Sequence, residues 1–391
     1  MPKSITDRLI SWSEDVEPQA LQQALRTSRL PILAGPLALM ADAHYGKGAT
    51  IGSVLATRRA IVPAAVGVDI GCGLLALRTE LVADELPDDL RAVLRRVERA
   101  IPAGTGRGHE ELDGERNEAL AALGLPKGST IDARQHRRIG EQFASLGSGN
   151  HFVEVSIDEL GRVWVVLHSG SRGIGNALAS RHIEIARRAA RAAGLAPEDP
   201  DLAWLAEGTP EFRAYVADLR WAQAYACASR AQMGRAALRA LYGALGRPEG
   251  GPALETVNCH HNYAIEELHD GEKVWITRKG AIRAGTGDRG VVPGSMGSAT
   301  YIVRGKGSAA SYESCAHGAG RRLSRHAARR LLSVGDLGAA MGRRTWLDQH
   351  ARALLDEAPQ AYKDIEEVMD AQSDLVEVEH RLVQVLNYKG T

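Results

Sequence analysis

The sequence predicts an α+β protein that folds as a single domain over residues 1–391. Strand-like and helix-like segments both occur throughout the chain, but they lack the regular strand–helix–strand order of a parallel α/β fold. A length of 391 residues would allow two or three domains, yet no internal repeat or low-complexity linker divides the chain. An apolar share of 44% is ordinary for a protein with a substantial buried core.

Strands are expected to dominate residues 31–82. Within them VGVDIGCGLLAL, residues 66–77, alternates apolar and small residues and predicts a buried strand. Such a strand would carry two ionisable side chains, Asp69 and Cys72, into the interior. Burying an uncompensated carboxylate costs on the order of several kcal/mol. We therefore expect this pair to meet an opposite charge or a metal ion.

The next segment, residues 83–130, is predicted to be helical and rich in loops. DELPDDLRAVLRRVERAI, residues 84–101, is typical of an amphipathic helix with acidic residues at its start. A flexible turn is expected at Gly104–Gly108. Residues 153–157 and 163–167 then predict two paired strands joined by a turn.

Two long helices are expected in the middle of the chain, over residues 176–195 and 211–245. Their apolar residues recur with a period near 3.6, and Gly194 is the expected C-cap of the first helix. Strands should return after Gly251, at residues 273–282 and 300–305.

The C-terminal part predicts one further helix over residues 321–333 and helical turns at residues 362–370. The pattern of residues 376–390 fits either a strand or a helix, so both alternatives stay open here.

Composition restricts the class of protein. The 48 basic and 48 acidic residues balance, whereas a non-specific nucleic-acid coat protein is usually basic, so positive charge for nucleic acid would have to be local. No run of 18 apolar residues predicts a membrane span, and the acidic N-terminal segment argues against a signal peptide. The widely spaced cysteines at 72, 227, 259 and 315 are expected to stay reduced. We expect a soluble, cytoplasmic protein.

Glycine-rich loops suggest phosphate binding. The chain has 42 glycines, many of them clustered, and loops of this kind can present several backbone N–H groups to a ligand. HSGSRGIGN, residues 168–176, places Ser169, Ser171 and Arg172 just ahead of a predicted helix, where an anion is favoured. Residues 293–300 and 317–322 form two further glycine loops.

Histidines mark the same regions. Five of them stand beside glycine, asparagine or a strand end: His151, His168, His260, His261 and His317. Any one alone would more often be a structural histidine. Together with Asp69 and Cys72 they supply imidazole, thiolate and carboxylate, which suit zinc, manganese, iron or cobalt. The residues therefore predict a metal-dependent enzyme of phosphate chemistry, and the donor types alone favour zinc.

Several motifs in this order resemble the RtcB family of RNA ligases, from about Pro31 to Gly390. They are PAAVGVDIGCG (63–73), GSGNHFVE (147–154), LHSGSRGIGN (167–176), NCHHNYA (258–264), RKGA (278–281), PGSMGSATYIVRG (293–305), CAHGAGRRLSR (315–325), AYKDIEEVMDAQSDLVEV (361–378) and the terminal YKG. The resemblance implies mixed sheets flanked by helices around a central cleft for metal and GTP.

The resemblance also implies an activity. Such a ligase uses GTP and Mn²⁺ to join an RNA 3′-phosphate or 2′,3′-cyclic phosphate to a 5′-hydroxyl, in RNA repair or tRNA splicing. His317 would be the nucleophile that forms a covalent histidine–GMP. Two Mn²⁺ ions, with Cys72 bridging them, would be bound by Asp69, Cys72, His151, His168 and His261. An archease-type activator is a further partner that the resemblance suggests, and no membrane is involved.

Guanosine contacts carry over by the same resemblance. They fall on Asn150, Glu154, Asn262, Pro293, Gly294, Ser295, Met296, Thr300, His317, Gly318, Ala319, Gly320 and Lys389. Glu154 and Lys389 would offer the acceptor and the donor that a purine edge requires, and Arg172 would suit an RNA phosphate.

The chain departs from the family pattern in four places, one of which is the absence of the polar loop often found just before GNHF. ADAHYGKG, residues 41–48, keeps Asp42 and His44 but lacks the usual proline, Thr300 replaces a common serine, and residues 101–146 form a short Gly/Arg-rich segment. These departures leave the RNA substrate open. Two other functions also stay open: a metal-dependent RNA-end phosphodiesterase or cyclic phosphatase without guanylylation, and a non-catalytic RNA- or ribosome-associated binding protein.

Overall fold

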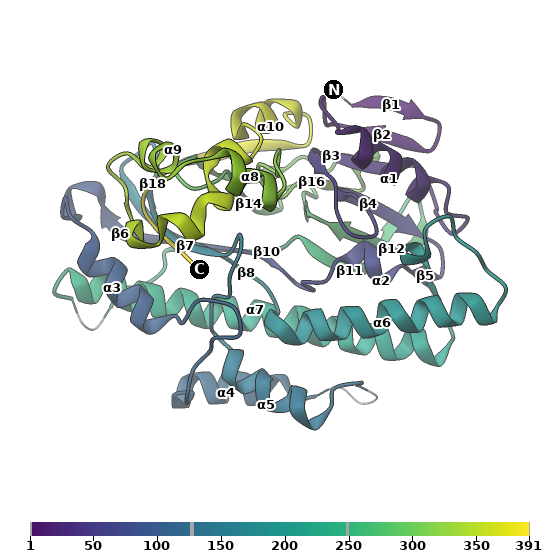
Figure 1. The fold of residues 1–391 in the computed structure, drawn as a ribbon, viewed down its shortest axis with the longest axis horizontal. Coiled ribbons are helices and arrows are strands. Elements are labelled where there is room, and N and C mark those ends of the chain that lie inside the picture. The colour runs from purple at the N-terminus through teal and green to yellow at the C-terminus, as the bar shows by residue number, and fades with distance from the viewer. Residues whose placement is uncertain (1, 126–128, 248–249, 391) are drawn as a thin grey trace.

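Two large β-sheets form the framework of the computed structural model, which describes residues 2–125, 129–247 and 250–390 (Figure 1). The smaller sheet has six strands in the order β1 (Lys3–Thr6), β2 (Leu9–Ser11), β3 (Leu37–His44), β4 (Ile51–Thr57), β12 (Glu272–Lys279) and β11 (Asn262–His269). The larger has the order β10 (Glu255–His260), β6 (Gly73–Val82), β8 (Arg162–Ser169), β7 (Phe152–Ile157), β18 (Val376–Lys389), β15 (Thr300–Gly305) and β14 (Arg289–Pro293), with β17 (Thr345–Trp346) pairing with β18.

Two short strand pairs, ten α-helices and five 3-10 helices complete the described elements. The pairs are β13 (Ala281–Arg283) with β16 (Ser314–Ala316), and β5 (Ala60–Ile61) with β9 (Leu205–Ala206). The helices are α1 (Pro18–Ser28), α2 (Pro63–Val66), α3 (Arg91–Ala100), α4 (Gly114–Leu123), α5 (Ala133–Gln142), α6 (Arg172–Ala192), α7 (Pro210–Ala244), α8 (Arg325–Leu331), α9 (Val334–Met341) and α10 (Ile365–Ala371). The predicted α+β class is confirmed.

Two long helices cover one side of the molecule. Figure 1 shows α6 and α7 running side by side, with α4 and α5 on their outer side. The 35-residue α7 starts at Pro210, and the Thr209 hydroxyl accepts the backbone N–H of Phe212 as its N-cap. It packs against strands of both sheets, which agrees with a single domain. Gly194, predicted to end α6, follows it with a φ of +69° and lies outside the helix itself.

The predicted strand over residues 66–77 is wrong in its first half. Pro63 begins the short helix α2, and the chain then turns through Gly67 and Gly71, whose φ angles are +95° and +72°. Positive φ is incompatible with an extended strand. The strand β6 therefore starts only at Gly73 and continues to Val82, so Asp69 and Cys72 lie in a buried turn beside the sheet.

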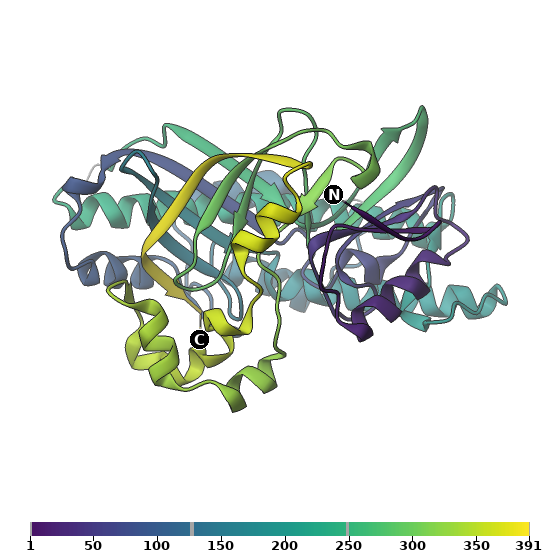
Figure 2. The same ribbon diagram turned by 90° about the horizontal axis from the view of Figure 1, so that it is seen from above.

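The C-terminal segment is a strand. The 14 residues of β18 lie between β7 and β15, and Figure 2 shows this strand crossing the larger sheet. The helix predicted over residues 84–101 is confined to α3, because Pro87 restrains Leu86 to an extended conformation. Likewise α8 begins only after its N-cap, Ser324. Residues 1, 126–128, 248–249 and 391 of the predicted domain lie outside the described residues, and 126–128 belong to its segment 101–146.

The main apolar core lies between the larger sheet and helices α3, α6 and α7, and a second core joins β3, β4 and β12 to β13, β16 and α10. All four cysteines are free thiols. Within the described ranges, no helix is both long and apolar enough to cross a membrane.

Candidate functional site

Four neighbouring strands of the larger sheet bring their predicted ligands to one edge. In the antiparallel register, Gly73 of β6 lies opposite His260 of β10 and opposite Ser169 of β8, while His168 lies opposite Phe152 of β7. The residues next to these positions are therefore neighbours in space, although they are up to 189 positions apart in sequence. Cys72, His151, His168 and His261 meet at this edge.

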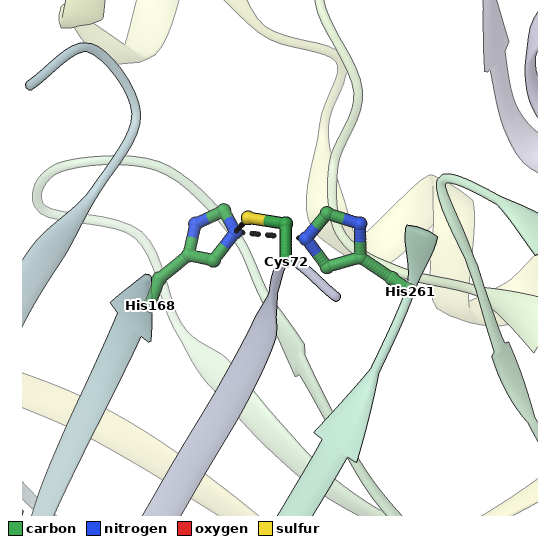
Figure 3. Close-up of side chains that lie close together, drawn as sticks. All are labelled: Cys72, His168 and His261. Atoms are coloured by element: carbon green, nitrogen blue, oxygen red, sulfur yellow. Dashed lines mark hydrogen bonds between the residues drawn. The ribbon is translucent and has the colours of Figure 1, made fainter. Parts of the chain in front are cut away.

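The side chains converge closely. The Cys72 Sγ lies 3.3 Å from His168 Nε2 and 3.4 Å from His151 Nε2, and the Nε2 atoms of His168 and His261 are 2.8 Å apart. Figure 3 shows Cys72 between the His168 and His261 rings. Two groups of donors suited to a metal ion result, Cys72–His168–His261 and Asp69–Cys72–His151, and Cys72 belongs to both.

Asp69 reaches the cluster because its turn is fixed by backbone contacts. Its Oδ2 lies 3.1 Å from His151 Nε2, and its Oδ1 accepts the Ser171 N–H at 3.0 Å. A Cβ at Gly170 would lie 2.2 Å from the same Oδ1, so only glycine leaves room for this carboxylate. Gly170 of the HSGSRG stretch therefore leaves the space that the Asp69 carboxylate occupies.

The imidazoles are oriented by the backbone. Nδ1 of His151 lies 2.8 Å from the Leu146 carbonyl, and Nδ1 of His168 lies 3.2 Å from the Asn150 carbonyl. A proton on each Nδ1 leaves the Nε2 lone pair facing the cluster, the usual arrangement of a metal-binding histidine. Burial also lowers the pKa of His168 and of His261 well below the ordinary value, which favours the neutral ring.

This donor set fits a divalent cation. Burial and the Asp69 carboxylate raise the pKa of the Cys72 thiol well above its ordinary value. The surrounding protein groups therefore do not supply enough positive charge to stabilise a thiolate at this position. Burial, the largest single influence, would raise the pKa of Asp69 too, but the contacts with His151 and Cys72 and the charge of Arg172 together outweigh it and lower this pKa. Soft and hard donors around one point match a borderline metal ion.

Arg230 of α7, which the sequence reasoning missed, supports the turn from behind. Its fully buried guanidinium donates to the carbonyls of Gly71 and Ser169, at 2.8 and 3.0 Å, and to Asn258 Oδ1 at 2.9 Å. These carbonyls precede Cys72 and follow His168. The i, i+3, i+4 pattern of the helix put Arg230 on the apolar face, and a charge on that face is the signal that could have identified it.

Replacing this arginine is expected to destabilise the fold. Arg230→Met would remove a buried donor from the Gly71 and Ser169 carbonyls and leave Gly71 only its contact with His260, so we expect the free energy of unfolding to fall by about 3 kcal/mol. Thermal and urea unfolding measure this. Arg235→Met is the matched control on the same helix, because its half-exposed ion pair with Glu115 contributes about 0.5 kcal/mol or less. Equal losses in both variants would contradict the role of Arg230.

His317 lies beside the candidate metal-ligand cluster formed by Asp69, Cys72, His151, His168 and His261. It follows β16, and its ring centroid is 4.6 Å from that of His261. Its Nδ1 lies 2.5 Å from Oδ2 of Asp42 on β3, in ion-pair contact though without hydrogen-bond alignment. Both Asp42 oxygens are buried, and within the described residues they have no hydrogen-bond donor, so His317 is the group available to pair with them.

A central cavity of about 350 Å³ joins these residues. Of the predicted metal ligands, Asp69, His168 and His261 line it, while Cys72 and His151 lie buried behind them. All of the predicted guanosine contacts line the cavity except Thr300, which lies behind it and donates to Glu154 at 2.8 Å. These lining residues are Asn150, Glu154, Asn262, Pro293, Gly294, Ser295, Met296, His317, Gly318, Ala319, Gly320 and Lys389.

A buried charge network holds Lys389 at the cavity wall. Its Nζ lies 2.9 Å from Oε2 of Glu357, which also contacts Arg321 and Arg325. Burial opposes the ionised form of Glu357, yet the cations lower its pKa to about 2. Glu357 therefore stays ionised and fixes the position of Lys389.

Other candidates lie apart from this centre. His260 turns away, with Nδ1 2.8 Å from the Gly71 carbonyl. Arg172 does not line the cavity; its Nε donates to the Ser145 hydroxyl at 3.1 Å. A third group, Asp158–Glu159–His380, has ligand-like spacing, but Arg162 donates to both Asp158 and His380 and offsets part of the negative charge.

Comparisons with known proteins agree with the motifs. A family model described as "tRNA-splicing ligase RtcB" matches residues 23–125 and 108–390. The chain is 42% identical to the RNA-splicing ligase RtcB of Escherichia coli (strain K12), over 97% of this chain and 96% of that protein. It is 33% identical to the RNA-splicing ligase RtcB of Mycobacterium tuberculosis, over 94% and 100%, and 29% identical to the tRNA-splicing ligase RtcB of Nanoarchaeum equitans, over 95% and 90%.

Proposed function

The chain belongs to the RtcB family, and on this basis we propose that it is an RNA ligase that uses GTP and Mn²⁺. It joins an RNA 3′-phosphate or 2′,3′-cyclic phosphate end to a 5′-hydroxyl end through a covalent histidine–GMP. The observation that carries the proposal is the position of His317, which lies in the cavity wall between the buried Asp42 and the metal-ligand cluster.

The nucleophile is Nε2 of His317. With the Nδ1 proton held toward Asp42, the Nε2 lone pair is free to attack the α-phosphorus of GTP. The new N–P bond forms as the bond to pyrophosphate breaks. Asp42 acts as a positioning residue, because it keeps the tautomer and stabilises the positive charge that develops on the ring.

Two further displacements complete the reaction of a 3′-phosphate end, and a 2′,3′-cyclic phosphate is first opened to that 3′-phosphate by water, with the proton of the water passing to the released 2′ oxygen. An oxygen of the RNA 3′-phosphate attacks the phosphorus of histidine–GMP, and the electron pair of the N–P bond returns to His317. The RNA 5′-hydroxyl then attacks the activated 3′-phosphorus and releases GMP. Two Mn²⁺ ions bound by Asp69, Cys72, His151, His168 and His261 would supply the positive charge that phosphate oxygens need in such steps.

Glu154 and Lys389 are proposed to read the guanine. Glu154 is fully buried with Oε2 lacking a hydrogen-bond partner among the described residues, so a carboxylate oxygen is available to guanine N–H donors. The Lys389 ammonium lines the same cavity as Glu154, and its ion pair with Glu357 holds it in place. A donor and an acceptor together distinguish guanine from adenine.

GTP affinity is expected to fall at acidic pH. Burial raises the pKa of Glu154 to about 7, so its carboxylate is ionised above this pH and becomes protonated below it. The ionised form accepts the guanine N–H groups; KM for GTP should therefore rise toward tenfold per pH unit as the pH falls below about 7. The rate of guanylylation at saturating Mn²⁺ measures this.

Glu154→Gln separates the effect of Glu154 protonation on KM for GTP from the loss of bound metal at acidic pH. Glu154→Gln binds GTP more weakly at every pH, but its KM should not change between pH 8 and 6 beyond the change in Mn²⁺ binding, measured in parallel. The same pH slope in both proteins would contradict the assignment to Glu154.

Intact-protein mass spectrometry after incubation with GTP and Mn²⁺ tests the proposed function, together with gel assays on RNAs bearing 3′-phosphate and 5′-hydroxyl ends. We expect a mass increase of one GMP and a ligated RNA. Opening of cyclic-phosphate ends without that increase would favour the phosphodiesterase instead. RNA binding that is steeply salt-dependent, indifferent to manganese and without turnover would favour a binding protein.

A further inference from the structure

One exposed aromatic side chain lies on the rim of the central cavity. Tyr45 follows β3 and is 53% exposed. Its neighbours in the loop, His44 and Lys47, both line the cavity. Because successive side chains of an extended chain point to opposite sides, the loop presents His44 inward and Tyr45 outward. A chain that leaves the cavity over this loop therefore meets the Tyr45 ring next.

The loop is attached firmly to α1, which lies beside β3 (Figure 1). Gln23 of α1 is buried, and its amide donates to the Gly46 carbonyl at 2.6 Å and accepts the Gly46 N–H at 3.3 Å. The amide also donates to the Gly48 carbonyl. These bonds flank Tyr45 on one side, so its backbone is held in place although its ring is exposed. An anchored ring loses little conformational entropy when a ligand stacks on it.

An open hollow separates Tyr45 from α1. It is lined by Pro18, Gln19, Gln22 and Arg26 of the helix together with Tyr45. Gln19, Gln22 and Arg26 are spaced i, i+3 and i+7 and therefore share one face of the helix. Arg29 one turn further is paired with Glu198, whereas Arg26 makes no ion pair within the described part of the chain, and its Nε donates to the Gln22 carbonyl at 3.3 Å.

The chemistry of this hollow suits a nucleobase. An aromatic ring supplies a stacking face for any base, the two amides can pair with base edges, and a guanidinium adds a planar cation. A phosphate is a poorer match, because the acidic Glu17 is the N-cap of the same helix. An exposed tyrosine alone is ordinary. Here its place on the cavity rim, its anchored loop and the facing polar stripe act together.

We propose that the hollow between Tyr45 and the Gln19–Gln22–Arg26 face of α1 is a stacking site for a nucleobase of the RNA, within the first few nucleotides of a reacting end. The inference rests on the proposed RNA ligation and adds a subsite outside the cavity. Tyr45 contributes to RNA affinity and takes no part in the chemistry of His317.

Direct binding measurements test the subsite. Fluorescence anisotropy of the full-length protein would use short single-stranded RNAs with either a 3′-phosphate or a 5′-hydroxyl end, and a series in which one terminal nucleotide at a time is abasic. Tyr45→Ala is expected to weaken binding of one of the intact RNAs about tenfold, and Tyr45→Phe to bind as the wild type does. Leu268→Ala, exposed in the distant hairpin of β11 and β12, is the control with unchanged binding.

The abasic series identifies the stacked base. At one position, the abasic RNA should bind wild type about tenfold more weakly, and Tyr45→Ala should add no further loss. Equal affinity of Tyr45→Ala and wild type for every intact RNA would overturn the proposal. So would a loss of affinity caused by Tyr45→Ala that is the same for the intact RNA and for every abasic RNA of the series. These binding measurements contain no GTP, so their outcome does not depend on the formation of histidine–GMP. Failure of the wild-type protein to form the adduct would refute the proposed function, and the binding data would still test the stacking site.

Discussion

His317→Ala is expected to abolish both the GMP adduct and RNA ligation. In the proposed reaction every ligated RNA passes through a covalent bond to Nε2 of His317, and alanine has no atom that can form it. The loss should exceed about a thousandfold, since the substitution removes the nucleophile itself. His261, whose ring is the neighbour at 4.6 Å, belongs to the metal-ligand cluster.

Intact-protein mass spectrometry and RNA gel assays measure this loss. The matched control is His326→Ala, an exposed histidine of α8 only nine positions further along, which should form the adduct at the wild-type rate. Mn²⁺ binding by His317→Ala should also be retained, because the five proposed ligands are intact. A GMP adduct that persists in His317→Ala would refute the assignment of the nucleophile.

Cys72→Ser is expected to weaken metal binding at both positions. Cys72 belongs to both donor groups, with its Sγ between the Nε2 atoms of His151 and His168. A serine hydroxyl in the same place stays protonated and supplies neither the charge nor the polarisability of a thiolate. Mn²⁺ affinity should fall more than about a hundredfold, and guanylylation should fall with it.

Calorimetric titration of the metal-free protein with Mn²⁺ gives the affinity and the number of ions bound. Cys227→Ala serves as the control, because this half-buried thiol on α7 is outside both donor groups. Thermal unfolding in a chelator shows whether Cys72→Ser still folds, so a loss of metal is not mistaken for a loss of structure. Two ions bound with wild-type affinity would contradict the proposed bridging role.

The sequence by itself was sufficient for the two long helices and for the types of donor in the site. The period of apolar residues located α7 to within one residue at each end, because a helix of 35 residues repeats its pattern many times. The concentration of histidines at glycine-flanked strand ends indicated a metal site before any geometry was available. The short pattern of residues 376–390 was ambiguous, since a strand that is buried on alternating faces differs little from a helix over so few turns.

The tertiary structure decided which of these residues meet. Antiparallel register placed Cys72, His151, His168 and His261 together and turned His260 toward the Gly71 carbonyl instead. Only long-range packing brought Asp42 of β3 to His317. No local pattern contains these pairings, because strand register depends on contacts made across the whole sheet.

Local signals also failed where glycine changes the backbone. The alternating residues 66–72 looked like a strand, but positive φ at Gly67 and Gly71 made them a turn that presents Asp69 and Cys72 to the site. Arg230 is the other case: its charge on an apolar helix face is visible in the sequence, yet its partners lie in three other segments. Composition and periodicity thus determined the long helices and the types of metal donor. The pairing of distant segments determined the site, because only the folded chain fixes which buried polar groups satisfy one another.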